Sequence, residues 1–204
     1  MPKNCHPWRE AETHLAACDP VLRRIIGVAG PCTLRPQTDY FGVLCESVVS
    51  QQLAVKAADA IFRRFAAFYG GRLVPDKVLG TPPERLRALG LSGQKAAYML
   101  DLAAKFHAGA VTPARFAVMS DEEIVAQLVS IKGIGVWTAH MFLIFALCRP
   151  DVLPTGDFGV RKAFLREYRL DTPPAKKVME DLAAAWRPWR SVGSWYLWRS
   201  LENK

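Results

Sequence analysis

The sequence predicts an all-α protein. Apolar residues recur at three- and four-residue spacing, as in Ile61, Phe62, Phe65 and Phe68, which is the pattern of a helix with one buried face. Glycine and proline pairs break these segments, and no run alternates apolar and polar residues as a half-buried strand would. We expect helices over residues 42–50, 53–69, 83–89, 93–106, 121–130, 136–147, 158–168, 174–186 and 191–201.

Composition narrows the class of protein. The 204 residues are 50% hydrophobic, enough to bury a substantial core, and the formal net charge of +8 favours a polyanionic partner. The five cysteines are scattered without a C-x-x-C pair, so we expect reduced thiols and no zinc site. No apolar run is long enough for a membrane span, and the first residues lack the apolar core of a signal peptide. We therefore expect an intracellular, cytoplasmic protein.

Two glycines mark a turn between helices. Ser120 and Glu123 form the pattern of a capping box, which opens a helix that leads to the tripeptide Gly133-Ile134-Gly135. Glycine allows a tight turn and a close backbone approach, and the helix that follows begins with free N–H groups. Such a hairpin can bind an anion such as a phosphate, although G-x-G alone is also common in plain helix-to-helix turns.

A lone acidic residue, Asp157, follows one helix later. A single carboxylate in a cleft can stabilise positive charge that develops during a reaction, and it can also orient a water molecule. Asp is equally a preferred N-cap residue, and Asp157 directly precedes the helix expected from Phe158. The position fits both roles, and one residue can serve both. Asp151 is a second acid in the same loop, where we expect it to cap a helix or stay solvated.

Three separated blocks resemble a known family. They are the hairpin with its Gly/Pro-rich loop and Asp157, the block SVVSQQLAVKAA at residues 47–58, and the Trp-rich block at residues 186–199. In this order they resemble the helix-hairpin-helix DNA glycosylases of the HhH-GPD superfamily, and in particular the AlkA/Mag-like alkylbase (3-methyladenine) branch. The resemblance covers residues 39 to the C-terminus.

The resemblance implies two helical subdomains with a DNA-binding cleft between them. One would span residues 39–149 and contain the helix-hairpin-helix motif. The other would combine residues 1–38 with residues 150–204 and carry the catalytic loop and the aromatic block. The implied partner is double-stranded DNA that contains alkylated bases, bound by a monomer, and no cofactor is implied.

The residue two positions after the second hairpin glycine sets the reaction type in this superfamily. Members that also cut the strand carry a lysine there as a Schiff-base nucleophile. This chain has Trp137 at that position, and Lys132 lies on the other side of the hairpin. The resemblance therefore implies a monofunctional glycosylase, in which Asp157 assists hydrolysis and the strand stays intact.

The base pocket implied by the resemblance is aromatic. Its residues are Trp137, Trp198, Phe158 and Met141, the last at a position that is aromatic in some relatives. A purine alkylated at a ring nitrogen is cationic, and aromatic faces attract cations. Aromatic residues on helices are more often core, which is what we expect of Trp186, Trp189 and Trp195.

The remaining contacts would hold the duplex. Flipping a nucleotide leaves a gap, and the resemblance places the intercalating wedge at Gln52 or Leu53, which otherwise would be helix-cap and core residues. Phosphate contacts are expected from a set of hairpin and basic residues: Gly133, Gly135, Lys132, Arg161, Lys162 and Arg190. No metal is expected in the chemistry, although the motif would allow a structural cation at the carbonyls of Gly133 and Gly135.

Two other functions fit parts of the sequence. A non-catalytic helix-hairpin-helix module would bind DNA, but it would need neither Asp157 nor the Trp-rich block. A glycosylase for deaminated, oxidised or mismatched bases would need to protonate a neutral leaving group, and the sequence shows no obvious second acid. We therefore expect excision of cationic bases of the 3-methyladenine or 7-methylguanine type.

Overall fold

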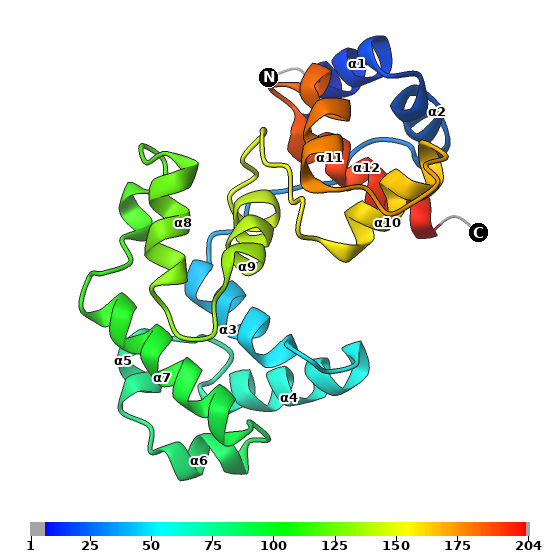
Figure 1. The fold of residues 1–204 in the computed structure, drawn as a ribbon. Helices are drawn as coiled ribbons and strands as arrows, with labels where there is room; N and C mark the ends of the chain where they lie inside the picture. Colours follow the sequence, from blue (N-terminus) through cyan, green and yellow to red (C-terminus); the bar gives the residue numbers. More distant parts are fainter. Residues whose placement is uncertain (1–6, 203–204) are drawn as a thin grey trace. The chain divides into compact units, whose positions relative to one another are not determined.

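The computed structural model describes residues 7–202, and every regular element in that range is helical (Figure 1). The predicted all-α class is confirmed. The elements, in chain order, are α1 (Arg9–Cys18), α2 (Pro20–Ala29), α3 (Tyr40–Ser50), α4 (Val55–Phe68), α5 (Pro75–Leu79), α6 (Pro83–Ala88), α7 (Gly93–His107), η1 (Pro113–Arg115), α8 (Asp121–Val129), α9 (Val136–Met141), η2 (Phe142–Ala146), α10 (Phe158–Glu167), α11 (Lys176–Leu182), η3 (Ala184–Trp186) and α12 (Arg190–Glu202).

The chain divides into two compact units. Unit 1 combines Met1–Pro36 with Leu143–Lys204, and unit 2 is the continuous segment Gln37–Phe142. The subdomain limits implied by the resemblance, 39–149 and 1–38 with 150–204, stay a prediction. Each unit has its own buried core and is described separately.

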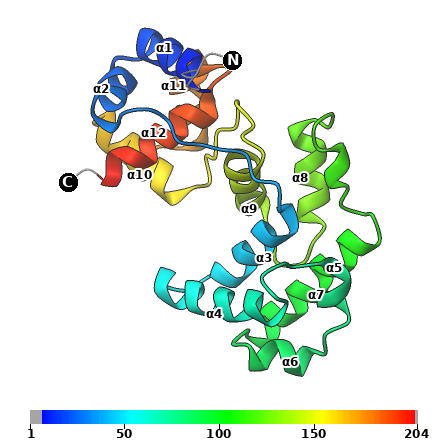
Figure 2. The same ribbon diagram turned by 180° about the vertical axis from the view of Figure 1, so that it is seen from behind.

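Unit 2 is built around α3, which packs against α4 and α7 (Figure 2). This helix is apolar at most positions, and Leu44, Cys45, Val48 and Val49 are completely buried. These buried residues face the neighbouring helices, and the polar residues Glu46, Ser47 and Ser50 lie on the opposite, less buried stripe of α3. The central helix therefore fixes where its C-terminal turn, residues 50–53, lies in the unit.

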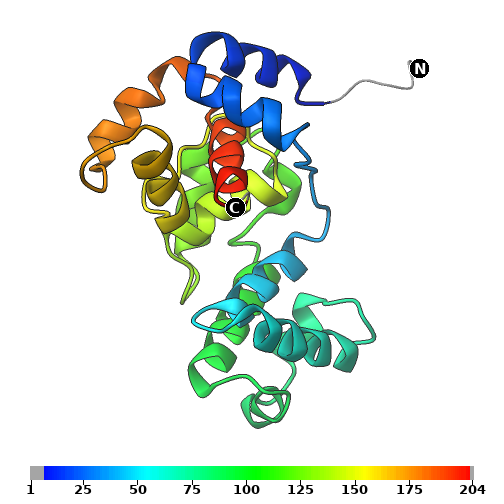
Figure 3. The same cartoon turned by 90° about the vertical axis from the view of Figure 1, so that its right-hand side faces the viewer.

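Unit 1 gathers helices from both ends of the chain. The last helix, α12, packs against α2 and α10, and α1 packs against α2 (Figure 3). Buried Asp19 joins these parts: its carboxylate caps α2 at Val21 N and Leu22 N, and it accepts hydrogen bonds from Tyr168 Oη (2.5 Å) and Trp186 Nε1 (2.8 Å). The segment around Asp19 is thereby part of the core against which α10 packs.

Several helix limits differ from those predicted. Helices α1, α2 and α5 were not predicted at all, although Asp19 followed by Pro20 is a favourable start for α2. The apolar run expected as one helix over 136–147 is α-helical only to Met141 and continues as the π-type turn η2 to Ala146. The helix expected over 174–186 is split into α11 and η3.

Candidate active site

The glycine hairpin joins α8 to α9 in unit 2. The predicted capping box at the start of α8 is present, with Ser120 and Glu123 each bonded to the other's backbone N–H. Gly133 has a φ of +81°, and a Cβ atom there would lie 2.1 Å from Cδ2 of Tyr98. Gly135 is the N-cap of α9 with a φ of −98°, and no neighbour lies within 4 Å of where its Cβ would be. Only the first glycine is therefore required by the geometry.

Hydrogen bonds fix the hairpin to the neighbouring elements. Lys132 donates its backbone N–H to Asp101 Oδ2 (2.8 Å), while its side chain remains 73% exposed. The Gly133 carbonyl accepts a hydrogen bond from Gln51 Nε2 (2.8 Å), which ties the hairpin to the turn after α3. The two segments predicted to touch DNA within unit 2 therefore lie side by side.

The turn at residues 50–53 is held by hydrogen bonds from Lys95. Lys95 Nζ donates to the carbonyls of Val49 (2.6 Å) and Gln51 (2.7 Å), and burial lowers the pKa of this ammonium group. Gln52 adopts a left-handed conformation with a φ of +56°, which is uncommon for a residue other than glycine. The predicted wedge residues Gln52 and Leu53 are both exposed. The chain reverses at Gln52, so α4 begins at Val55 and not at Leu53 as predicted.

A cavity of about 770 Å³ opens on unit 1, and a second of about 520 Å³ opens on unit 2. The one on unit 2 brings together three of the predicted site residues, Trp137, Met141 and Gln52. Its full lining is Val43, Glu46, Ser47, Ser50, Gln51, Gln52, Trp137, Thr138 and Met141. Trp137 is 49% exposed, so it is a surface residue of this cavity and not part of the core. Glu46 was not singled out from the sequence, where it is one polar residue in an apolar helix.

The predicted catalytic acid lies in unit 1 at the start of α10. Asp157 is only 8% exposed, and its Oδ1 atom accepts hydrogen bonds from Val160 N (2.7 Å) and from Trp198 Nε1 (2.8 Å). The N-cap role considered from the sequence is thus present. Trp198 also packs on Phe145, with ring centroids 5.3 Å apart, whereas Phe158 is 80% exposed. The carboxylate is therefore held by a helix N-terminus and one indole ring.

Gly159 makes the contact between the acid and the indole possible, and the sequence analysis missed it. A Cβ atom at this position would lie 3.0 Å from Cδ1 and Nε1 of Trp198 and 3.1 Å from Asp157 Oδ1. These distances are shorter than normal van der Waals contact, so a larger residue would push the two groups apart. A glycine inside a helix, two residues after an acidic N-cap, was the available signal.

The loop that leads to Asp157 is clamped to α12. Asp151 accepts hydrogen bonds from Arg190 Nε and Arg187 Nη1, both at 2.6 Å. Ser191 donates its backbone N–H to the Pro150 carbonyl (2.9 Å) and accepts from Val152 N through its hydroxyl (2.9 Å). The Arg190 side chain is 17% exposed and ion-paired, so this clamp is the role the structure gives it, where a phosphate contact was expected.

Two further basic residues expected at phosphates are placed differently. Arg161 donates Nε to the Pro174 carbonyl (2.9 Å), which anchors the segment before α11. Arg161 nevertheless remains exposed, and so does Lys162. Both lie on α10, within two turns of Asp157.

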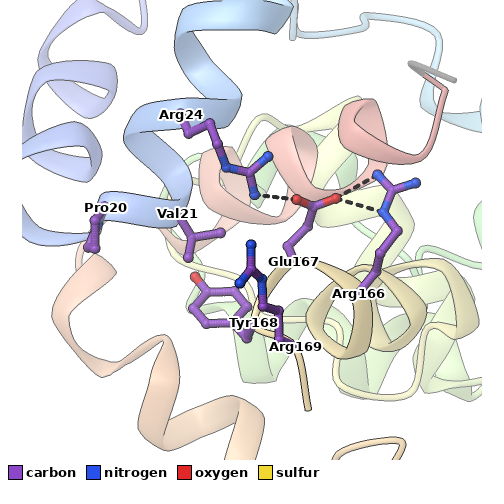
Figure 4. Close-up of a pocket in the computed structure, with 7 residues that line it drawn as sticks. All are labelled: Pro20, Val21, Arg24, Arg166, Glu167, Tyr168 and Arg169. Atoms are coloured by element: carbon purple, nitrogen blue, oxygen red, sulfur yellow. Dashed lines mark hydrogen bonds and ion pairs between the residues drawn. The ribbon is translucent and has the colours of Figure 1, made fainter. Parts of the chain in front are cut away.

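The larger cavity on unit 1 contains none of the predicted site residues (Figure 4). It is built around Glu167, whose carboxylate accepts from Arg24 (2.5 Å) and Arg166 (2.7 Å). Burial alone would raise the pKa of Glu167, but the two guanidinium groups outweigh it and hold the pKa below its usual value. We interpret this cluster as an ion-pair network that joins α2 to α10.

The described residues were also compared with the requirements of a metal site and of a membrane-spanning helix. Within residues 7–202, no group of three or more His, Cys, Asp or Glu side chains is arranged so that it could hold a metal ion. His107, a single histidine at the end of α7, is paired with Asp76 (2.6 Å). None of the helices within that range has the length and apolarity needed to cross a bilayer.

Comparison with known proteins identifies the family. The family described as "HhH-GPD superfamily base excision DNA repair protein" matches residues 45–188. The chain is 33% identical over 199 residues to "DNA-3-methyladenine glycosylase 1" of Schizosaccharomyces pombe, covering 95% of this chain and 87% of that protein. It is also 33% identical over 173 residues to the "Putative DNA-3-methyladenine glycosylase YfjP" of Bacillus subtilis, covering 80% of this chain and 60% of that protein.

A solved structure shows the same fold. The S. pombe 3-methyladenine DNA glycosylase Mag1, in complex with abasic DNA, superposes with a TM-score of 0.83 at 32% identity. The match covers 95% of this chain and 97% of that one. The helical fold is thus that of a base-excision DNA glycosylase. The chain belongs to the HhH-GPD superfamily of base excision DNA repair proteins, as the resemblance predicted.

Proposed function

We propose that this protein is a monofunctional DNA glycosylase that hydrolyses the N-glycosidic bond of alkylated bases in double-stranded DNA. The substrates would be of the 3-methyladenine and 7-methylguanine type, and the protein would act as a monomer on chromosomal DNA. One observation carries the proposal: the buried Asp157 carboxylate, fixed by Val160 N and the Trp198 indole. The names of the relatives support the same reaction class.

Asp157 would act on the sugar. As the bond to the base breaks, positive charge develops on the deoxyribose, and a carboxylate that is already oriented stabilises that charge without reorganising. The same carboxylate can orient the water that attacks the sugar carbon. An alkylated purine carries a positive charge and is a good leaving group, so base release would not require a separate proton donor.

Trp137 supports the monofunctional assignment. It stands two residues after Gly135, at the start of α9, and an indole nitrogen cannot form a Schiff base with the sugar. Lys132, the nearest lysine in sequence, has its backbone fixed to Asp101 and its side chain exposed to solvent. We assign Lys132 to a phosphate contact together with Gly133, Gly135 and Arg161, and not to strand cleavage.

The other site residues would bind the flipped nucleotide. We assign Gln52, with Leu53, to the gap left in the duplex, since both are exposed on a turn fixed by Lys95. Trp137 and Met141 would receive the base in the cavity of unit 2, and Trp198 and Phe158 would contribute aromatic surface in unit 1.

The test is base release from methylated duplex DNA by the wild-type protein and by Asp157→Asn. The amide oxygen of asparagine can still accept the two hydrogen bonds, so the fold and DNA binding should persist while release falls about 100-fold or more. Asp171→Asn is the matched control, because it removes an exposed carboxylate from the loop after α10. Free base and strand breaks are scored separately, before and after alkali.

Three outcomes would contradict the proposal or a part of it. Equal release by wild type and Asp157→Asn would remove Asp157 from the chemistry. Binding without release by the wild-type protein would favour a DNA-binding module, and strand breaks before alkali would contradict the monofunctional assignment.

A further inference from the structure

The cavity of unit 2 has an unusual charge for this protein. Nine residues line it, and Glu46 is the single one among them that carries a charge. The formal net charge of the whole chain is +8, so this cavity is locally negative on a positively charged protein. A negative wall disfavours a phosphate group and favours a positively charged ligand.

Glu46 belongs to the cavity wall and is not an incidental surface residue. Val43, Ser47 and Ser50 line the same cavity, and with Glu46 they stand at the three- and four-residue spacing that forms one stripe of α3. The two serine hydroxyls donate back to the helix, Ser47 to the Val43 carbonyl (3.0 Å) and Ser50 to the Glu46 carbonyl (2.8 Å). Their protons are therefore already engaged, and the wall offers a ligand chiefly the carboxylate.

The Glu46 carboxylate has no partner in the part of the chain that the structure describes. Among residues 7–202, no side chain or backbone group forms a hydrogen bond or ion pair with the side-chain oxygens of Glu46. Lys95 of α7, which holds the turn at residues 50–53, donates its Nζ protons to the carbonyls of Val49 and Gln51 and not to Glu46. A cavity lined both by this carboxylate and by the Trp137 ring is suited to a cationic ligand.

We propose that Glu46 makes this cavity a subsite selective for positively charged bases. The proposal rests on the glycosylase function proposed above. A purine alkylated at a ring nitrogen shares its positive charge over the rings, so it would be attracted both by the Glu46 carboxylate and by the face of Trp137. A neutral damaged base of the same size would gain neither interaction. Glu46 is thus a specificity-determining residue, and Asp157 remains the catalytic one.

The test compares two damaged bases in otherwise identical duplexes: 7-methylguanine, which is cationic, and 1,N6-ethenoadenine, which is neutral. Glu46→Gln keeps the shape of the side chain and removes its charge. We expect kcat/KM for 7-methylguanine to fall about five-fold, as for a partly screened charge, with less effect at high salt. Release of ethenoadenine should change by less than about two-fold, which is the size of an effect without a charge interaction.

Glu84→Gln is the matched control, since it removes an exposed carboxylate from α6 of the same unit. It should leave both substrates unchanged. An equal loss on both bases in Glu46→Gln would indicate a positioning role and overturn the proposal. No loss on 7-methylguanine relative to Glu84→Gln would overturn it as well.

A binding measurement separates this proposal from the function on which it rests. Asp157→Asn protein is titrated with duplexes that contain 7-methylguanine or guanine, with and without Glu46→Gln. A preference for 7-methylguanine that disappears with Glu46→Gln supports the subsite even if the wild-type protein releases no base, which would contradict the proposed function alone. If Asp157→Asn protein that retains Glu46 shows no preference for 7-methylguanine over guanine, the subsite proposal is overturned and the proposed function is not.

Discussion

The hairpin of unit 2 and the acidic loop of unit 1 are held by different forces. The hairpin is held by shape and by hydrogen bonds: Gly133 lies against the Tyr98 ring, its carbonyl accepts from the Gln51 amide, and the Lys132 backbone N–H donates to the Asp101 carboxylate. The loop is fixed by charge, since Asp151 pairs with Arg190 and Arg187. The Gly133–Tyr98 contact should be insensitive to salt, and the ion pairs of the loop should weaken as salt is added.

The largest effect is expected at the hairpin. Gly133→Ala would place a methyl group 2.1 Å from the Tyr98 ring at a positive φ, so the free energy of unfolding should fall by about 3 kcal/mol. Denaturant unfolding measures this change. Gly135→Ala is the control, because its Cβ meets no atom within 4 Å, and it should change stability by less than about 1 kcal/mol. Equal effects of the two substitutions would contradict the shape argument.

The clamp on the loop should give the next largest effect. Arg190→Met would leave the Asp151 carboxylate, which is 23% exposed, without its best partner, at a cost of about 2 kcal/mol. Unlike Gly133→Ala, this loss should shrink as salt is added. Arg187→Met removes the other partner, which is 61% exposed, and should cost less than about 1 kcal/mol. A loss from Arg190→Met that does not depend on salt would assign the effect to packing.

A smaller, pH-dependent effect is expected at Glu167. Its pKa in the folded state is lower than in the unfolded chain, because Arg24 and Arg166 outweigh the effect of burial. The resulting stability is present above the unfolded pKa, about 4.3, and is lost as the pH falls through the folded pKa. At neutral pH, Glu167→Gln should be about 1 kcal/mol less stable, since both arginines are partly exposed. Thermal unfolding across acidic pH should show the two curves converging.

The smallest effect on stability is expected at the predicted wedge. Gln52→Gly relieves a φ of +56° but gives the unfolded chain more freedom, so the two terms should cancel to within about 1 kcal/mol. If Gln52 fills the gap in the duplex, base release should fall although the fold is intact. Arg169→Gly is the matched control at a φ of +52°, and it should leave base release unchanged. Unchanged release by Gln52→Gly would move the wedge to Leu53.

The sequence predicted features that depend on local chemistry. The capping box at Ser120, the N-cap at Asp157 and the hairpin between two helices all follow from residues within three or four positions of one another. Helix class and most helix limits followed from apolar spacing in the same way. The π-type turn η2 was not predictable, because the apolar run continues unchanged through Phe142–Ala146.

Features that depend on contacts between residues far apart in the sequence could not be predicted. Trp198 donates to an acid 41 residues earlier in the chain, and Gln51 bonds a carbonyl 82 residues later. Glu46 gave no signal, since one acid in an apolar helix does not show which neighbours surround it. The resemblance named positions for the pocket, but the charge of the cavity came from the fold.

Gly159 places helix stability and site geometry in opposition. Within α10, alanine would be favoured over glycine by about 1 kcal/mol on helix propensity alone. The added methyl group would press on both Trp198 and Asp157, so the same change would loosen the hydrogen bond that orients the acid. A stabilisation programme that replaces helical glycines would select this position early and lose activity with it. Residue 159 is therefore one to exclude from any thermostabilised variant.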